Sequence, residues 1–128
     1  MEKGKEIKTY VVGTNGQIEK EKGKDYTGEM APAEFATLRA KYGTIITMVI
    51  PTDREFSGFA VGYLKKVDRP LMSAYLSMAD EIDKKAMLLD AIFIGGDRRI
   101  LESDDMFFSA CLEVERIVSF PKGVSVIF

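Results

Sequence analysis

The sequence contains no histidine and no tryptophan, and its single cysteine is Cys111. Without histidine the chain cannot build a Ser-His-Asp or Cys-His catalytic apparatus, nor the zinc sites of HExxH proteases and zinc deaminases. One cysteine cannot form an internal disulfide or a four-thiolate zinc site. Because Cys111 stands between Ala110 and Leu112, we expect a small buried hydrophobic residue rather than a reactive thiol.

An excess of charge of one sign is also missing, as is a long apolar run. Residues 1–64 carry nine basic and nine acidic side chains, and residues 65–128 carry nine basic and eleven acidic ones. Neither half is basic, so nucleic-acid binding is not expected. No apolar stretch approaches the roughly 18 residues of a membrane span, and the first residues lack the apolar stretch of a signal peptide. We therefore expect a cytoplasmic protein without a membrane partner.

The sequence has 128 residues, of which 46% are hydrophobic and 30% are charged. This length and composition are typical of one soluble globular domain. We expect an α+β fold in which a small, mostly antiparallel sheet accompanies a helical C-terminal half of about three helices. The single domain 1–128 divides into four parts. These are a β-hairpin and charged arm (1–29), a helix plus β-hairpin (30–66), a helical part (67–120) and a terminal strand (124–128).

The first part combines a hairpin pattern with a charged segment. Alternating residues from Glu6 to Val12 predict a strand, and Asn15-Gly16 is a strong hairpin signal. Residues 19–25 contain no apolar side chain. They predict either a solvated loop or a mobile arm that becomes ordered on a partner.

The second part is expected to begin with a helix from Pro32 to Tyr42 that ends at Gly43. Proline suits the first helical turn, where its missing N–H costs nothing, and glycine suits the position just after a helix. The apolar run Thr44 to Ile50 predicts a strand covered on both faces, with Phe56 to Lys66 as its hairpin partner. In that partner strand Phe59, Val61 and Tyr63 share one face, and Ala60 and Leu64 share the other.

Three further helices are predicted from their capping residues. Asp68 or Arg69, just before Pro70, opens the first of them. Asp80 caps a second helix over Glu81 to Ile94, which Gly95-Gly96 terminates. Ser103 caps the third, with acidic residues in its first turn.

Several short patterns suggest chemistry, and each has a structural alternative. The run Gly95 to Arg99 lacks the spacing of a phosphate-binding loop, so we interpret it as a helix end followed by a tight turn. Two acidic clusters, at 80–83 and 97–105, contain hard ligands for Mg²⁺ or Ca²⁺. Both stand where helices should begin, so caps and dipole partners are the favoured interpretation. We predict no catalytic residue, metal site or cofactor.

Broad apolar stripes on the last two predicted helices favour an oligomer or partner-binding interface. Six internal methionines add flexible apolar surface, although core filling is the favoured interpretation of them. The basic doublets Lys65-Lys66 and Arg98-Arg99 are interpreted as solvated ends or contacts to an acidic partner. The candidates for partner contact, with core and interface not yet separated, are Met87, Phe93, Met106, Phe107, Phe108 and Leu112.

The second half also resembles a family of small proteins from the tail-gene region of phages and prophages, of the tail assembly chaperone kind. The resemblance covers about residues 40–119. The resemblance rests on three features in this order: a strand ending in Gly62-Tyr63-Leu64-Lys65-Lys66, a helix start at Arg69-Pro70 and the later motif Ile94-Gly95-Gly96-Asp97. In such a family the Gly-Gly-Asp turn and the acidic caps are structural rather than catalytic.

The resemblance implies a noncatalytic function in a bacterial host: coating the hydrophobic tape-measure protein and recruiting tail-tube subunits. Broad apolar faces suit the binding of an amphipathic helix in a groove. Two alternatives stay open. The first is a structural virion component, such as a head, connector or tail subunit, that self-associates. The second is a small enzyme that relies on carboxylates, lysine or tyrosine.

Overall fold

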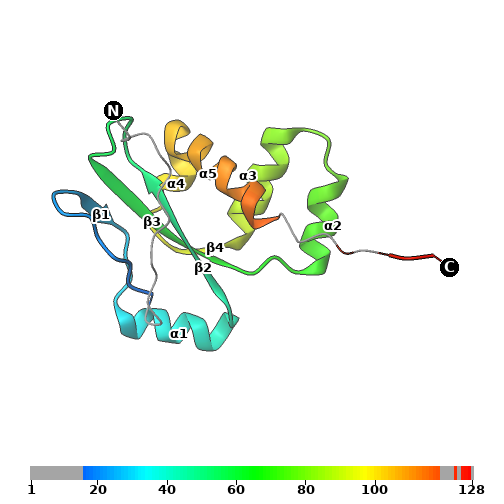
Figure 1. Ribbon diagram of the computed structural model, residues 1–128, viewed down its shortest axis with the longest axis horizontal. Helices are drawn as coiled ribbons and strands as arrows, with labels where there is room; N and C mark the ends of the chain where they lie inside the picture. The colour runs from blue at the N-terminus through cyan, green and yellow to red at the C-terminus, as the bar shows by residue number, and fades with distance from the viewer. Residues whose placement is uncertain (1–15, 119–122, 124, 128) are drawn as a thin grey trace.

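The computed structural model describes residues 16–118, 123 and 125–127 (Figure 1). In this part of the chain a four-stranded mixed sheet is combined with five helices, most of them in the C-terminal half, which confirms the expected α+β class. No helix among these residues is both long and apolar enough to cross a membrane. In chain order the elements are β1 (Asp25–Thr27), α1 (Pro32–Tyr42), β2 (Ile45–Pro51), β3 (Gly58–Lys65), α2 (Arg69–Ser77), α3 (Glu81–Ile92), β4 (Phe93–Gly96), α4 (Arg99–Glu102) and α5 (Asp104–Ile117).

Strand β3 is the centre of the sheet, because the other three strands all pair with it. Strand β2 runs antiparallel along one edge, from the pair Ile45 and Lys65 to the pair Pro51 and Phe59. The opposite edge is shared between two short strands, β1 in parallel at residues 58–60 and β4 antiparallel at residues 62–64. The predicted hairpin of β2 and β3 is therefore confirmed, and it forms the frame of the fold.

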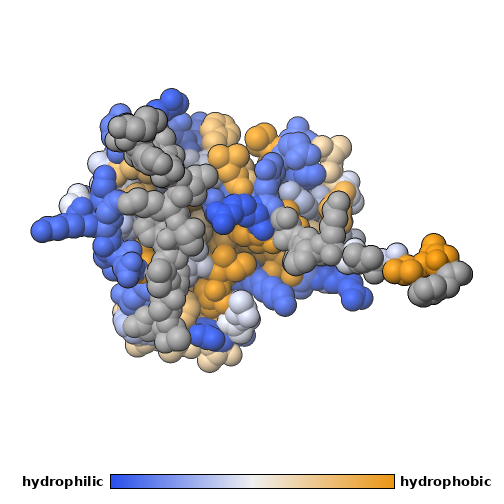
Figure 2. All heavy atoms as spheres, viewed as in Figure 1, coloured by the Kyte–Doolittle hydropathy of each residue, from blue (hydrophilic) through white to orange (hydrophobic). Residues whose placement is uncertain are grey.

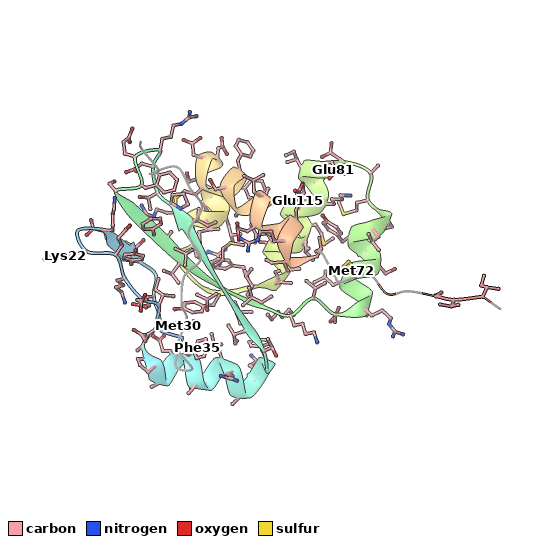
Figure 3. The ribbon with its side chains drawn as sticks, viewed as in Figure 1. Lys22, Met30, Phe35, Met72, Glu81 and Glu115 are labelled. Carbon is pink, nitrogen blue, oxygen red and sulfur yellow. The ribbon has the colours of Figure 1, made fainter. Side chains whose placement is uncertain are left out.

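The two faces of β3 contribute to two separate cores. Val61 and Tyr63 pack with Ile18 and with Phe35 of α1 on one face. Ala60 and Leu64 belong to the larger core on the other face, which is built from β2 and from the helices that follow β3. This division agrees with the predicted alternation along the strand. Figure 3 shows Met30 and Phe35 on the α1 side of the sheet.

Helices α1, α2 and α3 begin where their local signals predict. Helix α1 has the predicted bounds, and the backbone N–H of Gly43 closes it on the carbonyl of Arg39 at 2.8 Å. The carboxylate of Asp68 accepts a hydrogen bond from the backbone N–H of Leu71 at 2.9 Å. The carboxylate of Asp80 likewise accepts a hydrogen bond from the backbone N–H of Asp83 at 2.8 Å. Each cap satisfies a backbone donor that the first helical turn leaves unpaired.

The predicted end of α3 is wrong by two residues, and the Gly-Gly pair has a different role. The helix stops at Ile92, and Phe93–Gly96 form strand β4 rather than a helix end. Gly96 has φ +106°, and a Cβ there would lie 2.3 Å from the carbonyl oxygen of Val61. Glycine is needed because the chain passes against β3 at a distance that no side chain permits.

The start of the last helix also differs from the prediction. A short helix, α4, precedes it, and Ser103 occupies the N-cap position of α5 without a side-chain capping hydrogen bond. The backbone N–H of Ser103 instead closes α4 on the carbonyl of Arg99 at 2.8 Å. The serine therefore serves as the junction of two helices.

The charged segment at 19–25 is attached to the sheet in the structure. Lys20 forms an ion pair with Glu29, and Asp25 begins β1. Tyr26 stacks on Phe59 of β3 with ring centroids 5.1 Å apart. The segment is thus a loop, which is one of the two predicted alternatives, and it leads into a strand that the sequence did not predict. The predicted strand from Glu6 to Val12 lies outside the described residues.

The predicted terminal strand at 124–128 is not found in the residues that can be compared. Residues 125–127 have no secondary structure and extend away from the helices (Figure 1). Val126 and Ile127 are 66% and 95% exposed. A strand needs a partner edge, and within the described residues this segment has none. Val124 and Phe128 lie outside the described residues.

Candidate functional site

A groove between the β2–β3 turn and helix α5 is the candidate functional site. It has a volume of about 550 Å³ and an open mouth. One wall comes from the end of β2 and the turn that follows, and the other comes from the first three turns of α5. The lining residues are Pro51, Thr52, Asp53, Arg54, Phe56, Asp105, Phe108, Ser109 and Leu112.

The helical wall arises because α5 is apolar on two faces. Met106, Ala110 and Val114 recur every four residues and are buried against the sheet and α3. Phe108 and Leu112, also four residues apart, are rotated away from that contact and are 53% and 67% exposed. Figure 2 shows hydrophobic side chains reaching the surface around α5. The groove therefore has an apolar wall that no described residue covers fully.

The other wall is a strained turn held by a carboxylate. Asp53 accepts hydrogen bonds from the backbone N–H of Ser57 at 3.0 Å and from the Ser57 hydroxyl. These bonds, first of all the one from the hydroxyl, hold the pKa of Asp53 below its usual value, so the group is ionised at neutral pH. Phe56 has φ +60°, a conformation that non-glycine residues rarely adopt. The turn thus presents a negative charge and an aromatic ring to the groove.

The six predicted contact residues separate into three groups. Phe108 and Leu112 line the groove. Met106 is 3% exposed and belongs to the core, so a partner cannot reach it without a rearrangement. Met87, Phe93 and Phe107 are half-buried and pack against the same core.

Sequence reasoning missed the opposite wall of the groove. The run Thr52 to Glu55 has the composition of an ordinary polar turn, and nothing in it signals a binding surface. These residues join the site only because β2 ends beside the first turns of α5. The one local irregularity, the positive φ of Phe56, is visible only in the structure.

The acidic cluster at 80–83 has structural partners. The Asp80 carboxylate caps α3, and Glu81 forms an ion pair with Lys84 at 3.0 Å. Lys85 donates to Glu115 at 2.6 Å and lies 3.7 Å from Glu81, so it joins α3 to α5. Figure 3 shows Glu81 and Glu115 on these two helices. Among the described residues no group of three or more histidine, cysteine, aspartate or glutamate side chains is placed to hold a metal ion.

Cys111 is buried, as expected, and burial raises the pKa of its thiol. A raised pKa keeps the sulfur in the protonated, weakly nucleophilic form at neutral pH. Its proximity to the charge of Lys85 opposes this effect without overcoming it. The residue therefore acts as a small core side chain.

A second pocket of about 560 Å³ lies between α1 and β4 and is more polar than the groove. Two of its lining residues, Glu29 and Glu34, carry carboxylates. Glu29 is engaged, because it accepts a hydrogen bond from the backbone N–H of Ile18 at 2.8 Å and pairs with Lys20. Glu34 accepts from the backbone N–H of Ala31 at the start of α1. This pocket therefore has fewer polar groups available for a ligand than its composition suggests.

Comparison with known proteins adds no relative to this geometry. No protein-family model, curated protein or solved structure matches the chain.

Proposed function

We propose that this chain is a noncatalytic protein-binding protein of the phage tail assembly chaperone kind, acting in the cytoplasm of a bacterial host. Its partner is the tape-measure protein or another virion protein, and the groove between α5 and the β2–β3 turn receives an apolar segment of that partner. The observation that carries the proposal is the exposure of Phe108 and Leu112 along one wall of the groove.

The chemistry of the groove indicates what kind of segment fits. Phe108 and Leu112 are one helical turn apart, so their side chains form a continuous apolar strip. Asp53 and Asp105 line the same groove as charged groups. An amphipathic helix with apolar residues on one face and basic residues beside them would match both features.

The experiment is coexpression of the chain with the tape-measure protein of the same genome, followed by copurification. We expect a soluble complex with the wild-type chain and none with Phe108→Asp, because the carboxylate would lose its hydration in the contact. The matched control is Leu76→Asp, which places the same charge on an exposed residue of α2 that is 69% exposed and does not line the groove.

Two outcomes would contradict the proposal. Failure of the wild-type chain to copurify would count against the chaperone role. Equal binding by the wild-type chain and Phe108→Asp, with both chains folded, would remove the groove as the binding site.

A second candidate function, a structural subunit of the virion, is favoured by the exposed apolar segment at 125–127. Val126 and Ile127 project from the body of the protein with apolar side chains in water. Such a segment suits strand addition to the sheet edge of a neighbouring subunit. Mass spectrometry of purified particles distinguishes the two functions, because a chaperone is absent from finished virions and a subunit is present.

A further inference from the structure

The two ends of the β2–β3 hairpin carry charges of opposite sign. At the open end, Ile45 pairs with Lys65, and at the turn end Pro51 pairs with Phe59. A strand of seven residues is about 20 Å long at ~3.3 Å per residue. The open end lies beside the end of α1, and the turn end lies beside α4 and α5 (Figure 1).

The open end carries four basic side chains from three elements. Two lysines lie over the ring of Tyr42. The Nζ of Lys41 is 5.1 Å from the ring centroid, and the Nζ of Lys65 is 5.9 Å from it. Lys66 follows β3 directly and Arg69 opens α2. Within the described part of the chain, no salt bridge is formed by Lys41, Lys65, Lys66 or Arg69.

The turn end combines an apolar groove with a mainly acidic rim. Asp53 and Asp105 line the groove beside Phe108 and Leu112. Exposed Glu55 and Asp104 are the sequence neighbours of groove residues. Arg54 is the basic residue among those that line the groove, and it is engaged in an interaction of its own.

We propose that a second copy of this chain docks its basic end, formed by Lys41, Lys65, Lys66 and Arg69, into this groove. A lysine side chain has an apolar stem of four methylenes and a charged tip. The stems would lie on Phe108 and Leu112 while the ammonium groups reach the carboxylates of Asp53 and Asp105. The two surfaces are thus complementary in charge and in apolar character.

The contact is head to tail, because the donor and acceptor surfaces are different and lie at opposite ends of the hairpin. Each associated copy keeps one end free, so the assembly grows into a ring or an open chain rather than stopping at a symmetric dimer. The inference does not depend on the proposed function, and it stands even if no foreign protein enters the groove. Where a foreign segment does bind, it and the second copy compete for the same site.

The test uses sedimentation velocity of the full chain at low and high salt. The wild-type chain should sediment as species larger than a monomer at low salt and return towards the monomer at high salt. Lys65→Glu/Lys66→Glu blocks the basic end, and Glu55→Lys/Asp105→Lys blocks the acidic end. We expect each to weaken self-association at least about tenfold.

Mixing the two blocked variants gives the decisive result. The mixing uses the neutral variants Lys65→Gln/Lys66→Gln and Glu55→Gln/Asp105→Asn, because two charge-reversed ends would attract each other. One neutral variant retains a working acidic end and the other a working basic end, so the mixture should form a 1:1 dimer and nothing larger. The control Lys22→Glu/Lys24→Glu makes the same change of charge on the loop before β1 and should associate like the wild type. If charge reversal unfolds the acidic-end variant, Glu55→Gln/Asp105→Asn removes the two charges with less disturbance.

A wild-type chain that is monomeric at low salt and high concentration would overturn this inference. So would an associating wild type whose two blocked variants stay monomeric when mixed. Neither result changes whether the tape-measure protein copurifies with this chain. The failure of this inference can therefore be distinguished from the failure of the proposed function.

Discussion

The hydroxyl of Thr27 in β1 donates a hydrogen bond of 2.6 Å to the carboxylate of Asp97, which lies 70 residues later in the chain. Arg99 donates to the same carboxylate at 2.7 Å and to the Thr27 hydroxyl at 2.9 Å. The backbone N–H of Asp97 donates to the carbonyl of Val61 at 2.9 Å. One aspartate therefore connects β1, the central strand and the start of α4.

This carboxylate makes stability depend on pH. The hydrogen bond from Arg99 is the main reason that the pKa of Asp97 falls from 3.8 to about 2. Because the folded pKa is the lower one, the stabilisation is complete above about pH 3.8 and is lost as the pH falls towards 2. Asp97→Asn should cost about 1 kcal/mol at neutral pH, a value reduced by solvent screening at the half-exposed Arg99.

Urea unfolding of the wild type and Asp97→Asn across this pH range measures the effect. The difference between the two proteins should shrink on acidification. The control Asp90→Asn, at an exposed position of α3, should follow the wild type at every pH. A constant difference between the wild type and Asp97→Asn would contradict the assignment.

Gly96→Ala should destabilise the fold by about 3 kcal/mol, because the new Cβ meets the Val61 carbonyl and the backbone has a positive φ. Gly23→Ala is the matched control, since it shares a positive φ of +82° but has no atom within 4 Å of the new Cβ. Its cost should be about 1 kcal/mol. Thermal unfolding of both variants measures the difference, and equal losses would mean that the close approach of β4 to β3 is not required.

Met106→Ala should cost about 2–4 kcal/mol, because it leaves a cavity in the core. Leu112→Ala should change stability by no more than about 0.5 kcal/mol, because the side chain is already largely in water. Chemical denaturation of both variants tests which apolar residues of α5 belong to the core. A large loss at Leu112 would show that the groove wall is part of the core after all.

Lys85→Ala should destabilise the contact between α3 and α5 more than Lys85→Met does. Both changes remove the bonds to Glu115 and Glu81, but methionine retains most of the apolar stem that packs between the helices. The Glu115 hydrogen bond raises the pKa of Lys85, so this contribution is present at neutral pH and is lost only in strongly alkaline solution. Unfolding transitions of the two variants at neutral pH check the order, and Lys22→Ala, at an exposed turn, serves as the control.

The sequence by itself determined the elements whose signals are local. Pro32 and Gly43 set the bounds of α1, and Asp68 and Asp80 set the starts of α2 and α3, because capping satisfies backbone groups within four residues of the signal. The hairpin of β2 and β3 was equally predictable, since two apolar runs of strand length are joined by a short polar turn.

Only the tertiary structure decided the short strands and the groove. Strands of three and four residues, such as β1 and β4, obtain their stability from pairing with β3, and their own sequences contain little trace of it. The two apolar faces of α5 are alike in composition, so Met106 and Phe108 differ only in which one a neighbouring element covers. Whether a side chain of α5 is buried depends on where the neighbouring element lies. Residues distant in the sequence determine that position.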